Sequence, residues 1–128
     1  MKLTRRSVSG AVIIDVQGKL DGGFQDCIAF RELIGASVRG GEKRVVINLA
    51  EAPWANSVAI GMLVGAYTSV KNAGGELVLA SVPDRIHHVL SVTRLTRVLR
   101  TLPSESEALT YLSGIKGLGA GAALAALG

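Results

Sequence analysis

The residues able to do chemistry are few, and they are poorly placed for catalysis. Cys27 is the only cysteine, which excludes a disulfide within the chain and a cysteine-based metal cage. His87 and His88 are adjacent, so on a helix they point about 100° apart and are poorly placed to chelate one metal. The sequence has no Gly-x-Ser-x-Gly elbow, Walker-type phosphate loop or Cys/His pair. We therefore expect a binding protein rather than an enzyme, with no metal and no cofactor.

The most informative pair is Asn56-Ser57, where a loop leads into an apolar helix expected at about residues 58–73. Both residue types cap helices by accepting a hydrogen bond from a free N–H group, a contribution of about 1 kcal/mol. That structural role is a sufficient explanation for the pair taken alone. The hydroxyl of Ser57 is also a candidate for phosphorylation. A phosphate adds roughly −1.5 to −2 charges, which the positive end of a helix tolerates.

The expected helix has two different faces. The face that we assign to the core, at about 100° per residue, contains Ile60, Leu63, Val64, Tyr67 and Val70. The opposite face contains Val58, Met62 and Gly65, and it carries no charge until the polar end formed by Lys71, the first charged residue, and Asn72. An uncharged outward face indicates a docking surface, although another part of this chain, such as the tail, is an alternative cover. The predicted partner-binding residues are Asn56, Ser57, Val58, Met62 and Gly65. A phosphate on Ser57 would spare the fold and disrupt this interface.

The elements that position this helix alternate between strand and helix. Strands are expected at 3–8, 12–16, 44–49 and 76–80, with a short edge strand at 97–100 and a tight turn at Ser9-Gly10. Helices are expected after Gly22-Gly23, at 58–73, after Pro83 and at 104–112. This order predicts an α/β domain, a mixed sheet of about four to five strands with about four helices packed on it.

Two further helix patterns have simple packing interpretations. The first helix has an apolar stripe that we expect to face the sheet, with Cys27 as a packed thiol; the stripe is Phe24, Cys27, Ile28, Ile34 and Val38. Gly61 and Gly65 form a Gly-x-x-x-Gly spacing, which indicates close packing of two helices. The chain of 128 residues is expected to form one domain over 1–113, followed by a Gly/Ala-rich tail over 114–128.

The net charge of +4 is mild, and no aromatic residue sits inside a basic run, so nucleic acid is not an expected partner. No window approaches the ~18 apolar residues of a membrane span, and we expect a cytoplasmic protein. The last third is locally basic, which fits either a solvated face or contact with an acidic partner surface; its basic residues are Arg85, His87, His88, Arg94, Arg97 and Arg100.

Several segments in order resemble the STAS domain of bacterial anti-sigma factor antagonists. They are residues 18–21 (GKLD), 45–49 (VVINL), 56–63 (NSVAIGML), 74–79 (GGELVL), 83–95 and 104–109 (SESEAL). The resemblance as a whole runs over most of the chain, from about Val12 to Leu112. The resemblance implies a small sheet covered by helices and a protein without catalysis of its own. The family pattern has aspartates where this chain has Asn48 and Asn56, and serine-glycine where it has Val58-Ala59.

The resemblance also implies a mechanism. In the family, the serine at the helix mouth is phosphorylated by a serine kinase that is itself the anti-sigma factor. The unphosphorylated form binds that kinase and frees the sigma factor, and a phosphatase resets the switch. Ser57 falls on the phosphorylated position, and Val58, Met62 and Gly65 fall on the docking helix. Alternatives are a STAS subunit of a lipid-transport or stressosome-like assembly that binds without phosphorylation, or a nucleotide-binding module using the amides of residues 57–59. The sequence also leaves open whether the chain forms a homodimer.

Overall fold

The structure is a computed structural model that describes residues 1–115. Its elements in chain order are β1 (Lys2–Val8), β2 (Ala11–Gln17), α1 (Phe24–Arg39), β3 (Arg44–Glu51), α2 (Ser57–Asn72), β4 (Glu76–Ala80), α3 (Asp84–Val92), the 3-10 helix η1 (Leu95–Arg97), β5 (Thr101–Leu102) and α4 (Glu105–Ser113). The predicted order of strands and helices is confirmed. Among these described helices none is both long and apolar enough to cross a membrane.

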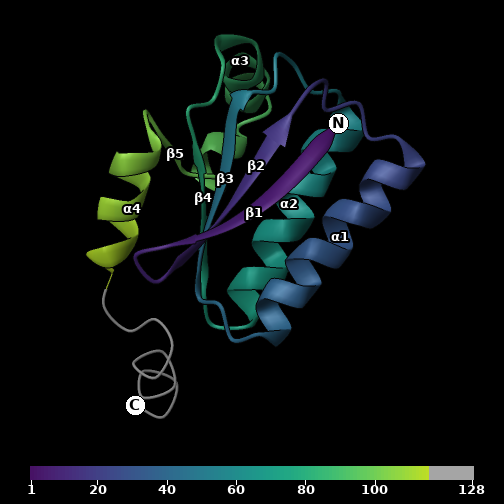
Figure 1. Ribbon diagram of the computed structural model, residues 1–128. Helices are drawn as coiled ribbons and strands as arrows, with labels where there is room; N and C mark the ends of the chain where they lie inside the picture. The colour runs from purple at the N-terminus through teal and green to yellow at the C-terminus, as the bar shows by residue number, and fades with distance from the viewer. Residues whose placement is uncertain (116–128) are drawn as a thin grey trace.

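The five strands form one mixed sheet in the spatial order β1-β2-β3-β4-β5. β1 pairs with β2 antiparallel through a turn at Ser9 and Gly10, both at positive φ, as the two-residue turn between these strands requires. The other neighbouring pairs are parallel, and each is joined by a helical crossover. The result is a layered domain with α1 and α2 against one face of the sheet and α4 against the other (Figure 1).

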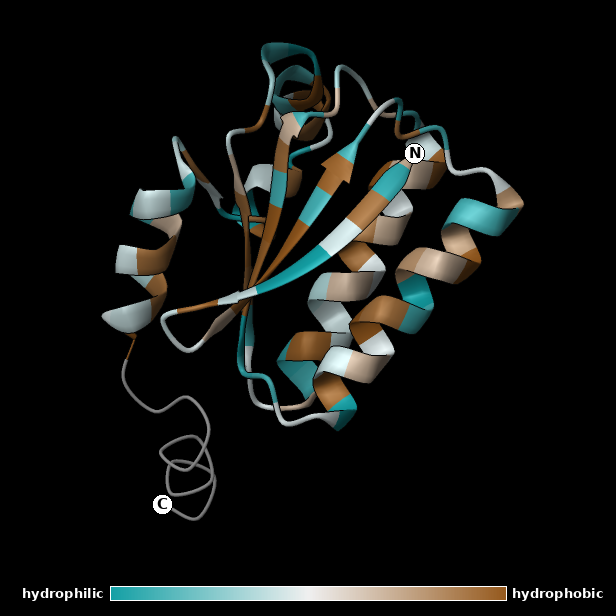
Figure 2. Cartoon of the chain, viewed as in Figure 1, coloured by the Kyte–Doolittle hydropathy of each residue, from teal (hydrophilic) through white to brown (hydrophobic). Residues whose placement is uncertain are grey.

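Each face of the sheet has its own apolar core. Alternate residues of the central strands point to opposite faces, so Ile14 and Ile47 pack with α1, α2 and α3, whereas Ile13 and Val46 pack with α4. All four side chains are fully buried. The central strands are accordingly hydrophobic along most of their length (Figure 2). This doubly covered sheet is the rigid support on which α2 is held.

Two sequence expectations about local structure were wrong. Residues 97–100 do not form a strand: Leu95–Arg97 forms η1, and the edge strand is Thr101–Leu102. Leu99 is fully buried, and its amide donates to the carbonyl of Leu95. The chain therefore forms a helical turn at these residues, and pairing with β4 begins only at Thr101. The expected buried stripe of α1 is also wrong at its start, because Phe24 is 76% exposed and Ile28 is 38% exposed. Phe30 and Ile34 are the apolar side chains of α1 that are buried in the core.

The expected tail at 114–128 lies almost entirely outside the described residues. Gly114 caps the end of α4, and Ile115 packs against the smaller core beside that helix. The division of the chain into a domain at 1–113 and a tail therefore stays a prediction.

Candidate interaction site at the amino end of α2

The loop that leads into α2 is held by the segment that follows β2. Leu20 forms an isolated parallel bridge with Ala55, and both side chains are buried. The amide of Leu20 donates to the carbonyl of Trp54 (3.0 Å), and the amide of Asn56 donates to the carbonyl of Leu20 (3.1 Å). These bonds fix the loop at the carboxyl end of the parallel strands, where binding sites of open α/β sheets commonly lie.

Asn56 is the N-cap of α2, as the sequence predicted. Its Oδ1 accepts a hydrogen bond from the amide of Ala59 (2.9 Å), and its Nδ2 donates to the carbonyl of Asp21. One side chain thus joins the helix start to the loop before α1. Because the cap is made by Asn56, the hydroxyl of Ser57 is not needed for that role.

Ser57 is the first residue of α2 and is exposed. The amides of Ala59 and Ile60 are already bonded to Asn56, by its side chain and its carbonyl respectively. The first amides of a helix lack intrahelical partners, so those of Ser57 and Val58 make no hydrogen bond within α2. The first turn contains no acidic residue. A phosphate on Ser57 would therefore lie at the positive end of α2 and would meet no negatively charged side chain in the first turn of that helix.

Val58 stands beside Ser57 and is 56% exposed, although it rests on the backbone of the neighbouring loop. That loop approaches through Gly22, which has φ +71°. A Cβ atom added at Gly22 would lie 2.6 Å from Cγ1 of Val58 and 3.2 Å from the amide of Ala59. Only glycine allows this approach, so Gly22 sets how closely the loop packs on the first turn of α2.

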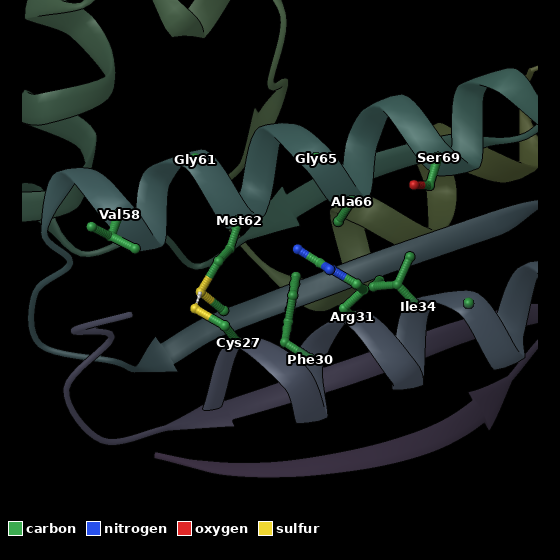
Figure 3. Close-up of a pocket in the computed structure, with 11 residues that line it drawn as sticks. Cys27, Phe30, Arg31, Ile34, Val58, Gly61, Met62, Gly65, Ala66 and Ser69 are labelled. Atoms are coloured by element: carbon green, nitrogen blue, oxygen red, sulfur yellow. Dashed lines mark hydrogen bonds between the residues drawn. The ribbon is translucent and has the colours of Figure 1, made fainter. Parts of the chain in front are cut away.

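A groove of about 470 Å³ runs between α1 and α2. From α2 it is lined by Val58, Gly61, Met62, Gly65, Ala66 and Ser69, and from α1 by Cys27, Phe30, Arg31, Ile34 and Gly35. Figure 3 shows Met62 and Cys27 facing each other across it and Arg31 reaching from α1 toward α2. The Sγ of Cys27 lies 3.2 Å from the Sδ of Met62 and 3.2 Å from the carbonyl oxygen of Gly22. Met62 is therefore half-buried at the wall of the groove rather than fully outward.

The interpretation of Gly61 and Gly65 as a close helix contact was wrong. Both residues are exposed, and a Cβ atom added at either would meet nothing of the described chain within 4 Å. The two glycines instead leave an open floor in the groove, one turn apart on α2. A helix-stabilising alanine would fit at both positions in this chain, so neither glycine is explained by the packing of residues 1–115.

Sequence reasoning missed three residues near this surface. Phe24 and Ile28 are exposed one turn apart on α1, and Arg31 is the charged residue that lines the groove. Periodicity placed Phe24 and Ile28 on one side of a helix but could not tell which side the sheet covers.

Asn48, another position that departs from the family pattern, lies on the opposite face of the sheet from α2. Its Nδ2 donates to Oδ1 of Asp15 (2.8 Å), on the sheet face that carries α4. Arg6 binds the same carboxylate through Nε (2.6 Å) and Nη2 (3.0 Å), and its Nη2 also reaches Glu105 at the start of α4. The hydrogen bonds from Arg6, and then from Asn48, lower the pKa of Asp15 despite partial burial. These four residues, which we call the Arg6 clamp, join three strands to α4.

A mixed sheet with helices on both faces, and an apolar groove with a serine at its mouth, define a small α/β domain. The family model for the STAS domain matches residues 2–108, and the chain belongs to this family. The predicted fold class is thereby confirmed.

Relatives and solved structures agree with this assignment. An anti-sigma F factor antagonist of Paenibacillus polymyxa is 25% identical over 103 residues, 80% of this chain and 87% of the relative. A Thermotoga neapolitana homologue of an anti-sigma factor antagonist is 31% identical over 74 residues, 58% of this chain and 66% of that relative, slightly under two thirds of its length. Unphosphorylated SpoIIAA, an anti-sigma factor antagonist, has a TM-score of 0.68 at 17% identity, covering 89% of this chain and 100% of SpoIIAA. The phosphorylated form of SpoIIAA, from Bacillus, has a TM-score of 0.67 at 18% identity, covering 86% and 98%.

Proposed function

We propose that this chain is an anti-sigma factor antagonist that binds and sequesters an anti-sigma factor with serine-kinase activity, and that phosphorylation of Ser57 releases that partner. It acts by binding and carries out no catalysis of its own. A phosphatase would reset the switch, and the working compartment would be the cytoplasm. The observation that carries the proposal is the exposed hydroxyl of Ser57 at the mouth of an apolar groove whose glycine floor is unfilled.

The proposed interface begins at Asn56, Ser57 and Val58 and continues along the groove past Met62 and Gly65. A partner helix or loop seated there would cover Val58 and the open floor at Gly61 and Gly65. Phe24 and Ile28 are two further exposed apolar side chains on α1, the helix that forms the other wall of the groove. Exposed apolar surface of this kind is typical of protein-binding sites.

Phosphorylation would act on the interface and not on the fold. The helix end favours the added charge, and the cap at Asn56 does not involve the serine hydroxyl. A partner that buries Val58 would have to desolvate roughly −1.5 to −2 charges beside it. The phosphorylated protein should therefore stay folded and lose its partner.

The direct test incubates the protein with its cognate kinase and ATP and measures the intact mass. We expect a gain of one phosphate in the wild type and in Ser69→Ala, and none in Ser57→Ala. Ser69 is the matched control, because it is an exposed serine on the same helix that also borders the groove. A phosphate gain that persists in Ser57→Ala would refute Ser57 as the modified residue.

A second candidate is constitutive binding within another STAS assembly, favoured by Asn56 where the family carries an acid. Asn56 provides the cap but no charge that could orient the hydroxyl or the kinase. The same mass measurement separates the two functions when it is combined with affinity capture. An unchanged mass together with retained partner binding would favour the constitutive form.

A further inference from the structure

A second hollow lies at the far end of α2 from Ser57, and its character is opposite to that of the groove. It encloses about 310 Å³ and is bordered by polar side chains from four parts of the chain. They are Tyr67 of α2, Glu76 at the start of β4, Arg97 and Arg100 flanking the turn into β5, Thr101 of β5 and Tyr111 of α4.

The arginines are presented by an anchored segment. Arg94, at φ 62°, turns the chain from α3 into η1, and the fully buried Leu99 fixes the middle of the segment. The carbonyl of Arg100 accepts from the amide of Leu79, which ties that residue to the sheet. Arg97 and Arg100 therefore border one hollow from a segment held at both ends.

The charge of the hollow is positive and is not neutralised within residues 1–115. The one carboxylate that borders it, Glu76, is already paired with Lys71 at 2.8 Å. The hydrogen bond to Glu76 raises the pKa of Lys71, as expected for a cation held by a carboxylate. Among the described residues no carboxylate forms an ion pair with Arg97 or Arg100.

Arg100 is also oriented. Its guanidinium carbon lies 4.7 Å from the centre of the Tyr111 ring. A guanidinium placed over an aromatic ring keeps N–H groups that can bind an oxyanion bidentately. The phenol of Tyr111 and the hydroxyl of Thr101 add neutral donors around the same space.

We propose that this hollow binds the phosphate group of a small phosphate monoester, independently of the interface at Ser57. Arg97 and Arg100 would supply the charge-assisted hydrogen bonds. A dianion suits the site better than a monocarboxylate, because it neutralises both arginines at once and offers three acceptor oxygens to the surrounding donors.

Calorimetric titration of the full chain with glycerol 3-phosphate, adenosine monophosphate, inorganic phosphate and acetate tests the proposal. We expect the phosphate compounds to bind at least about tenfold more tightly than acetate. Equal binding of both monoesters would show recognition of the phosphate alone, and tighter binding of adenosine monophosphate would identify a nucleotide as the source. Both results support the site. No binding of any phosphate compound at millimolar concentration, or equal binding of acetate, would overturn it.

Substitutions of the two arginines test whether the phosphate binds in this hollow. Arg97→Gln and Arg100→Gln should each raise the Kd about tenfold or more, because each removes a charge-assisted hydrogen bond. Arg85→Gln makes the same charge change at an exposed position of α3 and should leave the Kd unchanged. Arg100→Gln also removes the stack on Tyr111, so Arg97→Gln, with a thermal melt to check the fold, decides the result. Equal weakening by Arg85→Gln would refute the assignment. Ser57→Ala should bind phosphate normally, which keeps failure of this site distinct from failure of the proposed switch.

Discussion

The two sides of the sheet differ in whether their surface groups find partners within the described chain. On the α4 side, the Arg6 clamp satisfies its charges internally, with Asp15 bound by both Arg6 and Asn48. On the α1 and α2 side, the groove leaves apolar side chains and two glycines without an internal partner in residues 1–115. The stability of the fold accounts for the satisfied network, whereas residues 1–115 alone do not account for the unfilled surface. Substitutions in the two regions should therefore separate stability from binding.

The largest expected effect is loss of partner binding in Val58→Glu. A carboxylate buried without a partner at the interface should weaken binding by about 2–4 kcal/mol, or ~30- to 1000-fold. Because Val58 is 56% exposed, the free energy of unfolding should change by less than about 0.5 kcal/mol. Calorimetry with the anti-sigma partner and urea unfolding measure the two quantities.

Val92→Glu is the matched control for this substitution, since Val92 is 63% exposed on α3 and lies away from the groove. It should bind the partner as the wild type does. If both valine variants lose binding equally, or neither does, the groove is not the interface.

Asp15→Ala should have the opposite effect to Val58→Glu: it should lower stability and leave partner binding unchanged. It leaves Arg6 without its bidentate partner and Asn48 without its acceptor, so we expect a loss of about 1–3 kcal/mol in the free energy of unfolding. Partner binding at 25 °C should be unchanged because the clamp lies on the other face of the sheet. Urea unfolding and calorimetry again measure both. Weaker binding without loss of stability would mean that the clamp contacts the partner.

The stability that the Arg6 clamp contributes should decrease at low pH. The pKa of Asp15 is lowered in the folded protein by its bond to Arg6, so its contribution to stability is present above the pKa of the unfolded chain, about 3.9. That contribution is lost as the pH falls through the folded pKa. In urea unfolding, the wild type should exceed Asp15→Asn in stability by its full margin at pH 7, and the margin should shrink below about pH 4. A margin independent of pH would exclude an ionised Asp15 as its cause.

The sequence predicted most of the framework because the framework depends on local signals. Apolar runs at Val45–Leu49 and Glu76–Ala80, glycine ends and the Asn56 cap each act over a few residues. The clamp could not be predicted, because Arg6 and Glu105 are 99 residues apart and meet only once α4 has packed. The groove was half predicted. The outer face of α2 was found, but the approach of α1 to Met62, and the exposure of Phe24, depend on how two helices share one sheet.

Gly61→Ala is the smallest change and the sharpest test of the comparison, because it should move stability and binding in opposite directions. Alanine removes the helix penalty of glycine, about 0.5–1 kcal/mol, and its methyl group meets nothing of the described chain within 4 Å. The same methyl group would occupy floor that the partner needs, and overpacking of about 1 kcal/mol would weaken binding roughly fivefold. Ser69→Ala is the control, since it also favours the helix but adds no bulk to the groove. If Gly61→Ala stabilises the protein and leaves binding intact, the open floor is a feature of the free helix and the partner docks elsewhere.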